Sequence, residues 1–190
     1  CDVGLTVTVE ELERCSNVPQ VKGNGSRYSI KFNWIPSYLS LQGILNLFKE
    51  SDIYYNKNTL LFGNETTQSI VSKIGDTDLN EINLKSPASK FLTDFKPSRS
   101  KTEFQQQTRV LEKGIVANGY IYSTFAPVKL NSAYIFRSIT FSPVRTSSRF
   151  TFWNTDLIIA FKIVGQETDG SIVFIWKKLK EKSAPYLENK

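Results

Sequence analysis

The chain has 190 residues, of which 40% are hydrophobic and 13% aromatic, so it can bury the core of a globular domain; disorder, collagen and a disulfide-stapled miniprotein are excluded. It contains no His, no Met and 2 Cys, which excludes a histidine-based catalytic triad, a His-liganded zinc or haem site and a four-cysteine metal cluster built from this chain alone. The net charge of +6 lies wholly in residues 101–190, which hold 13 Lys and Arg against 7 Asp and Glu, and because these basic residues are spread out we interpret them as a solvated surface.

The cysteine at position 1 bears on where the protein is located. The mature form of a bacterial lipoprotein begins with a lipid-modified cysteine, and a chain that begins with Cys1 resembles that pattern. Two alternatives stay open, a disulfide between Cys1 and Cys15 in an oxidising compartment and two free thiols. The sequence has no run of about 18 apolar residues, which a membrane-spanning helix needs. We therefore expect an extracytoplasmic protein, secreted or membrane-anchored, that meets a membrane only through a lipid anchor.

The first hundred residues are predicted to be rich in helices and loops. Thr8 and Glu11 fit a capping box that opens a short helix ending at Cys15. Alternating apolar residues from Tyr28 to Phe32 predict a strand. Four apolar residues within 41–48 then follow the i, i+3, i+4, i+7 spacing of one helix face, so we expect an amphipathic helix there.

Two further helices are predicted before residue 101. The segment from Thr67 to Ile74 is interpreted as a helix with three apolar residues turned inward. Ser86 as N-cap and Pro87 at the first helical position predict the start of another helix. A polar loop over residues 96–101 should follow it, because Pro97 stops the helix.

From Thr102 onward the pattern is that of strands. The clearest pair is an antiparallel hairpin of residues 157–164 and 171–177, whose turn contains Asp169 and Gly170. Alternation predicts that Leu157 and every second residue after it face one side of that sheet, and the intervening residues the other. Other strands are expected at residues 120–123, 133–141 and 150–152.

These elements predict an α+β fold in which N-terminal helices pack on a C-terminal antiparallel β-sheet of four or five strands. We expect a single domain over residues 1–190, helix-rich in 1–100 and strand-rich in 101–190. The element order over residues 39–180 resembles the cone-shaped nuclear-transport-factor-like fold and the helix-grip lipid-transfer fold. That resemblance implies a pocket between helices and sheet. The alternative architecture is a β-sandwich or barrel with added helices.

Arg137 is the first candidate for a ligand-binding residue because it shares the parity of the apolar residues in the strand 133–141. A buried guanidinium needs a partner, which is either an anionic ligand or a structural ion pair. Asp156 as a general acid and Lys162 as a reactive amine are weaker candidates, so no catalytic residue is assigned. Lys162 is interpreted as an outward lysine that protects a sheet edge.

Several aromatic residues lie at less apolar positions and are candidate binding residues. Tyr120, Tyr122 and Trp153, with Tyr54 and Tyr55, could stack on a sugar or anchor a protein interface, and half-buried packing is the alternative. No nucleic-acid signature accompanies them, so no nucleic-acid partner is expected.

One segment has the spacing of a calcium loop. Asp76, Asp78 and Asn80 alternate as ligands in such a loop do, but Glu81 stands where glycine is required and Pro87 where the last glutamate belongs. We therefore expect no metal and no other cofactor.

The sequence favours a non-catalytic, exported binding or assembly domain, with a surface lipoprotein anchored through Cys1 as one form of it. Its partners would be a protein or glycan surface or copies of itself. The first alternative is a carrier of a lipid or another small ligand, in which Arg137 meets an anionic group. The second alternative is a carboxylate-based hydrolase, for which no convincing pair of carboxylates is found.

Overall fold

The computed structural model describes residues 37–39, 53–56, 58–63, 66–141, 154–166 and 172–188 of the chain. Several sequence predictions fall on residues outside these ranges: the helices near 8–15 and 41–51, the strands near 28–32 and 150–152, the turn at Asp169 and Gly170, and the candidate residues Cys1, Cys15 and Trp153.

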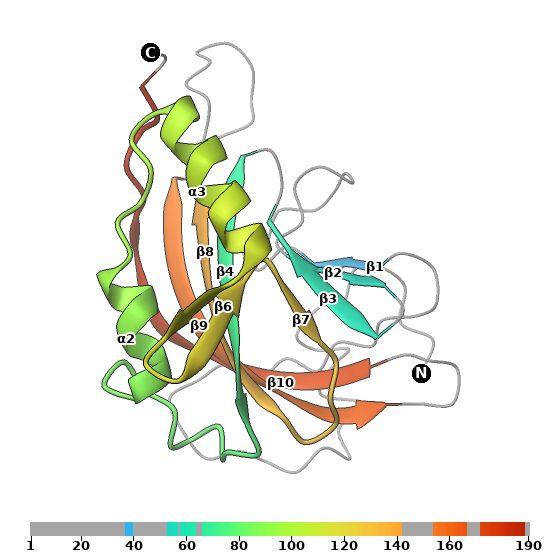
Figure 1. Ribbon diagram of the computed structural model, residues 1–190. Coiled ribbons are helices and arrows are strands. Elements are labelled where there is room, and N and C mark those ends of the chain that lie inside the picture. The colour runs from blue at the N-terminus through green and yellow to red at the C-terminus, as the bar shows by residue number, and fades with distance from the viewer. Residues whose placement is uncertain are drawn as a thin grey trace, which may run out of the picture.

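Within these described ranges, ten strands form two antiparallel sheets (Figure 1). The large sheet has six strands in the order β10-β9-β8-β4-β6-β5: β4 (Thr67–Gly75), β5 (Ile115–Ala117), β6 (Tyr120–Ser123), β8 (Ala133–Thr140), β9 (Thr155–Gln166) and β10 (Ile172–Ser183). The small sheet has four strands in the order β1-β2-β3-β7: β1 (Ser37–Leu39), β2 (Ile53–Asn56), β3 (Thr59–Phe62) and β7 (Phe125–Pro127).

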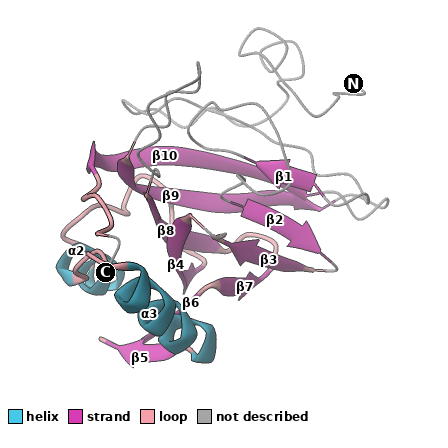
Figure 2. Cartoon of the chain, turned by 90° about the horizontal axis from the view of Figure 1, so that it is seen from above, coloured by secondary structure: helices cyan, strands magenta, loops and turns pink. Residues whose placement is uncertain are grey.

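The two faces of the large sheet are covered by different layers (Figure 2). Helices α2 (Pro87–Asp94) and α3 (Lys101–Lys113) lie against one face, and the small sheet packs against the other. The large sheet is therefore the middle layer, and its central strands are buried on both sides.

Strand β9 confirms the predicted alternation. Leu157, Ile159, Phe161 and Ile163 belong to the core between the two sheets, and the intervening apolar residues belong to the core beneath the helices. The predicted hairpin is confirmed too, since β9 and β10 pair antiparallel over 12 residues each. The hairpin could be recognised because a segment with turn residues, 165–170, separates two apolar segments of strand length.

Helix α2 also forms where it was expected. Ser86 occupies the N-cap position and Pro87 begins the helix, although the Ser86 hydroxyl accepts a hydrogen bond from the Asn83 amide rather than capping the helix. Leu92 is fully buried, and Phe91 and Phe95 pack at the edge of the same core.

The predicted helix from Thr67 to Ile74 is wrong, because this segment is strand β4. Strand β4 lies between β8 and β6, and most of its residues are buried whichever face they point to. A strand buried on both faces has no polar alternation to reveal it, and Ile70, Val71 and Ile74 happen to match a helical spacing.

The prediction that only strands follow Thr102 is also wrong, because residues 101–113 form α3. Its N-terminus carries a signal that is visible in the sequence, since the Ser100 hydroxyl accepts a hydrogen bond from the Glu103 amide at 3.2 Å. The inward face holds few apolar residues, with Phe104 and Leu111 the buried ones, so the periodicity is weak.

The α+β class is confirmed, but the large sheet has six strands instead of four or five, and helical structure does not dominate the described part of residues 1–100. The small sheet was not predicted. With two sheets packed face to face and helices on the outside, the described architecture corresponds to the alternative of a β-sandwich with added helices.

The chain passes from the small sheet to the large one at Gly63, whose φ is +87°. A Cβ atom at this position would lie 2.8 Å from the carbonyl oxygen of Thr67 and 3.3 Å from the Ser69 side chain, so glycine is required. Near the same crossing, the Phe62 amide donates at 2.8 Å to the carbonyl of Thr124, the residue that connects β6 of the large sheet to β7 of the small sheet.

We expect Phe161→Ala to lower the free energy of unfolding by about 3–5 kcal/mol, because the ring lies in the middle of the inter-sheet core and its loss leaves a cavity. The Phe161 ring stacks on Tyr134 with centroids 4.8 Å apart and contacts Phe174 at 5.4 Å. Urea unfolding measures the change. The exposed Val110→Ala serves as the control, and a loss for Phe161→Ala no larger than that of the control would contradict this core.

Candidate functional site

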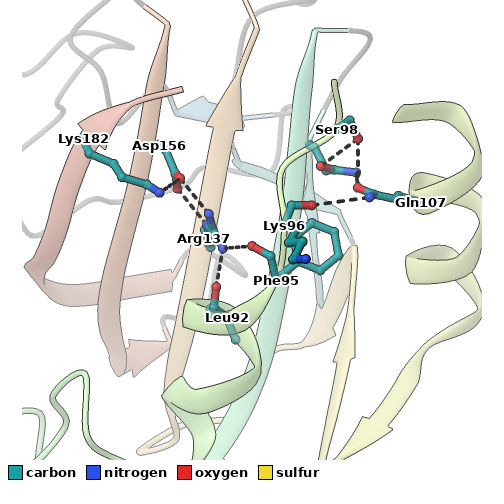
Figure 3. A network of polar contacts seen from close by, with 9 residues as sticks. Leu92, Phe95, Lys96, Ser98, Gln107, Arg137, Asp156 and Lys182 are labelled. Carbon is teal, nitrogen blue, oxygen red and sulfur yellow. Dashed lines mark hydrogen bonds and ion pairs between the residues drawn. The ribbon is translucent and has the colours of Figure 1, made fainter. Parts of the chain in front are cut away.

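The predicted binding residue Arg137 lies in the middle of the helix-covered face and forms a buried ion pair (Figure 3). Its Nε and Nη2 atoms each donate to one carboxylate oxygen of Asp156, both at 2.7 Å. Arg137 is 2% exposed and Asp156 is 1% exposed. The fork geometry of guanidinium and carboxylate satisfies both groups at once, which is what makes a buried pair tolerable.

The same guanidinium holds the C-terminal end of α2. Its Nη1 atom donates to the backbone carbonyls of Leu92 and Phe95, the latter at 2.8 Å. The last carbonyls of a helix have no partner within the helix and carry a partial negative charge, so a cation is favourable there. Arg137 therefore connects β8, β9 and α2.

Lys182 adds a second cation to this group. It is the cross-strand partner of Asp156 on β10, and its Nζ atom lies 3.3 Å from the Asp156 carboxylate. Because Lys182 is half-exposed whereas the other two side chains are buried, it stands between the ion pair and solvent. Each of the three nitrogen atoms of the Arg137 guanidinium already donates to a carboxylate or backbone oxygen, which favours the structural ion pair over an anionic ligand.

A second buried polar network, not predicted from the sequence, fixes α3 to the large sheet. Gln68 of β4 donates from Nε2 to Oε1 of Gln107 on α3 at 2.9 Å, and the Ser98 hydroxyl donates to the same oxygen at 2.8 Å. Gln68 and Ser98 are buried. Isolated Gln and Ser residues carry no periodic signal, so only the capping pair before α3 could have directed attention to this region.

The predicted contact residues Tyr120 and Tyr122 both lie on the helix-covered side. Tyr122 is fully buried, its hydroxyl donates to the Ala88 carbonyl at 3.0 Å, and its ring centroid is 4.4 Å from that of Phe91. Burial, with a smaller contribution from nearby Tyr120, raises the pKa of Tyr122 to about 12. Tyr120 packs half-buried against the same core. Both tyrosines therefore occupy packing positions, the alternative to a binding role. Tyr122 contacts the first turn of α2, and Arg137 contacts its C-terminal end.

Lysine ammonium groups contact the segment that has calcium-loop spacing. Lys162 donates to Asp76 Oδ1 at 3.0 Å and to the Thr77 carbonyl at 3.2 Å, and Lys177 donates to the Asn80 carbonyl at 3.1 Å. Lys162 does not protect a sheet edge, because β9 lies between β10 and β8. No group of three or more His, Cys, Asp or Glu side chains that could hold a metal ion is found in the described part of the chain.

The face of the small sheet that points away from the large sheet carries exposed apolar residues. Leu61 and Phe125 are direct cross-strand partners and are 38% and 46% exposed. The register continues this row to Tyr54 on β2 and Tyr38 on β1. We call the positions of Tyr38, Tyr54, Leu61 and Phe125 the outer row. No strand of the small sheet contains a charged residue.

Comparison with protein-family models, with curated proteins and with solved structures found no match for this chain. Among the described residues, neither helix has the length and apolar character to cross a bilayer.

We expect Arg137→Met to lower the free energy of unfolding by about 3–5 kcal/mol, because it leaves Asp156 buried with only the half-exposed Lys182 as a charged partner. The double variant Arg137→Met, Asp156→Leu should recover most of that loss, and urea unfolding measures both. The matched control is Lys90→Met, which removes an exposed ion pair on α2 and should cost less than about 1 kcal/mol. If the double variant is as unstable as the single one, the uncompensated charge is not the cause.

We expect the free energy of unfolding to fall as the pH rises from 10 towards 12. The pKa of Tyr122 is 10.0 in the unfolded chain and about 12 when folded, so burial of the neutral hydroxyl stabilises the fold fully below pH 10, and this contribution is lost as the pH approaches 12. Tyr122→Phe should make the free energy of unfolding less dependent on pH in this range without removing the dependence, because burial also raises the pKa of Tyr134. Chemical unfolding across this pH window checks the effect, and identical slopes for the two proteins would contradict it.

Proposed function

We propose that this chain is a non-catalytic binding domain that contacts a protein or glycan partner through the outer row of the small sheet. The observation that carries the proposal is the exposed pair of Leu61 and Phe125 on a sheet face whose strands hold no charged residue, in a chain of which 22% is charged. A neutral face with apolar and aromatic residues in one row is a typical contact surface, because its desolvation costs little.

The exposed Phe125 ring of the outer row suits both classes of partner. A tyrosine or phenylalanine contributes a large apolar area with few rotatable bonds, so it loses little conformational entropy when a partner covers it. The register places the backbone positions of the outer row, one on each strand of the small sheet, about 4.8 Å apart from strand to strand. The row is therefore long enough to meet several side chains or sugar rings together.

The contacts of the buried charges support a role without catalysis. Among the described residues, the acidic side chain that is buried is that of Asp156, and it forms ion pairs with Arg137 and Lys182. A general acid or base needs a proton that it can exchange with substrate, whereas this carboxylate accepts hydrogen bonds from a guanidinium that is always charged. The carrier alternative is weakened in the same way, since the Arg137 guanidinium already contacts protein oxygens.

The expected extracytoplasmic location and the lipid on Cys1 are separate predictions. The proposed contact through the outer row does not depend on either of them.

Photo-cross-linking from position 61 tests the proposal. With benzoylphenylalanine in place of Leu61, we expect a discrete adduct with a protein of the native cells, or retention on one of a panel of immobilised neutral polysaccharides. Excess wild-type chain should compete this binding, and Phe125→Lys should compete at least 10-fold less well because it places a charge in the outer row.

The control places the same photo-cross-linker at Val110, which is 52% exposed on α3. That position should give no adduct that the wild-type chain competes. The proposal is overturned if Phe125→Lys competes as well as the wild-type chain, or if neither saturable adducts nor polysaccharide binding occur.

A further inference from the structure

The two edges of the large sheet differ in a way that bears on association. Strand β10 ends with four lysines within residues 177–182 and is irregular between Lys178 and Lys180. Lysines and bulges are the features by which an edge strand resists pairing with another chain. Strand β5, at the opposite edge, has neither: it consists of Ile115, Val116 and Ala117.

The hairpin that ends in this second edge is apolar and exposed. Val116 and Ile121 are direct cross-strand partners on β5 and β6 and are 77% and 65% exposed. Ser123 lies two residues after Ile121 on β6 and therefore on the same face of the large sheet. It pairs with Val71, which belongs to the core between the two sheets, so Val116 and Ile121 lie on the face against which the small sheet packs. The small sheet does not extend over these two side chains.

The hairpin is held in one conformation by its turn. Asn118 and Gly119 connect β5 to β6 and have φ values of 52° and 80°, as a two-residue turn with two positive φ angles requires. A contact made by such a preformed strand needs little additional ordering. Figure 2 shows β5 at the outer margin of the large sheet, below α3.

We propose that β5 is the contact strand of a symmetric dimer, in which β5 pairs antiparallel with β5 of a second copy and Val116 lies opposite Val116. An antiparallel pair of identical strands is related by a two-fold axis, so the same edge serves both copies. Ile121, Val116 and their counterparts would then form one apolar row across the joined sheets, while Ile115 would lie opposite Ala117.

The charge distribution favours a second copy at this edge over the other. Two chains of net charge +6 repel each other, and at β10 the lysines of one copy would meet those of the next. Strands β5 and β6 contain no charged residue, so this contact brings no like charges into direct opposition. The contact is small, which makes a weak, concentration-dependent dimer the expected form.

Sedimentation equilibrium of the full chain up to about 1 mM tests this dimer. Val116→Lys should raise the dimer dissociation constant at least 10-fold, because two ammonium groups would then face each other across the two-fold axis. The control Val110→Lys adds the same charge to an exposed valine on α3 and should change the constant less than 3-fold. Both substituted side chains are exposed in the folded chain, so circular dichroism should show the wild-type fold.

A cysteine pair tests the register. Val116→Cys should oxidise to a disulfide-linked dimer well above the level of the wild-type chain, because directly opposed strand residues have Cα atoms within disulfide range. Ile121→Cys, which lies one strand further from the axis, should not. The proposal is overturned by a wild-type chain that stays monomeric, or by equal effects of the two lysine variants. A dimer that Phe125→Lys weakens while Val116→Lys does not would also overturn it.

Discussion

The buried pair of Arg137 and Asp156 is the constraint on which the described architecture depends. A guanidinium buried in a sheet is tolerable only if its N–H donors meet acceptors, and here the acceptors are the Asp156 carboxylate on β9 and backbone carbonyls at the C-terminal end of α2. Arg137 therefore holds the C-terminal end of α2 against the large sheet. With α2 in place, Tyr122 finds the Ala88 carbonyl at the other end of the helix. One charged residue thus sets the spacing of helix layer and sheet.

The two faces of the large sheet are specified by different kinds of contact. Under the helices, directional polar contacts at Arg137 and Gln68 anchor α2 and α3 at defined positions, so this side has one geometry. Between the sheets, aromatic and aliphatic side chains such as Phe161 make apolar contacts, and the Tyr134 hydroxyl donates to the Pro127 carbonyl at 2.7 Å. The polar contacts on the helix side give the arrangement of helices and sheet its specificity, while the packing between the sheets is mainly apolar.

How much of the fold the sequence predicts depends on whether an element is marked by a local signal such as a turn or a helix start. Strand β9 was predicted because turn residues separate it from the next apolar segment, and helix α2 because Pro87 follows Ser86 at its start. Strand β4 was not, since burial on both faces removes its alternation. For the candidate site, parity correctly indicated that Arg137 is buried, but a sequence cannot say which acceptors meet it, because Leu92 and Phe95 lie more than forty positions away along the chain. The turn at Asn118 and Gly119, which connects β5 to β6, is marked in the sequence by an Asn-Gly pair, a residue pair typical of two-residue hairpin turns.

The pairing of β4 with β8 has a kinetic consequence. Thr67 and Thr140 meet across 73 positions of the chain, and both helices and three short strands lie between them. Strands β8, β9 and β10, in contrast, are joined in sequence order. Loop closure is slower and entropically more expensive for the distant pair, so the C-terminal strands can assemble first and present the edge of β8 as a template. Strand β4 would join that edge late, and during this interval an unpaired, apolar strand edge is where a newly made chain is most exposed to misassembly.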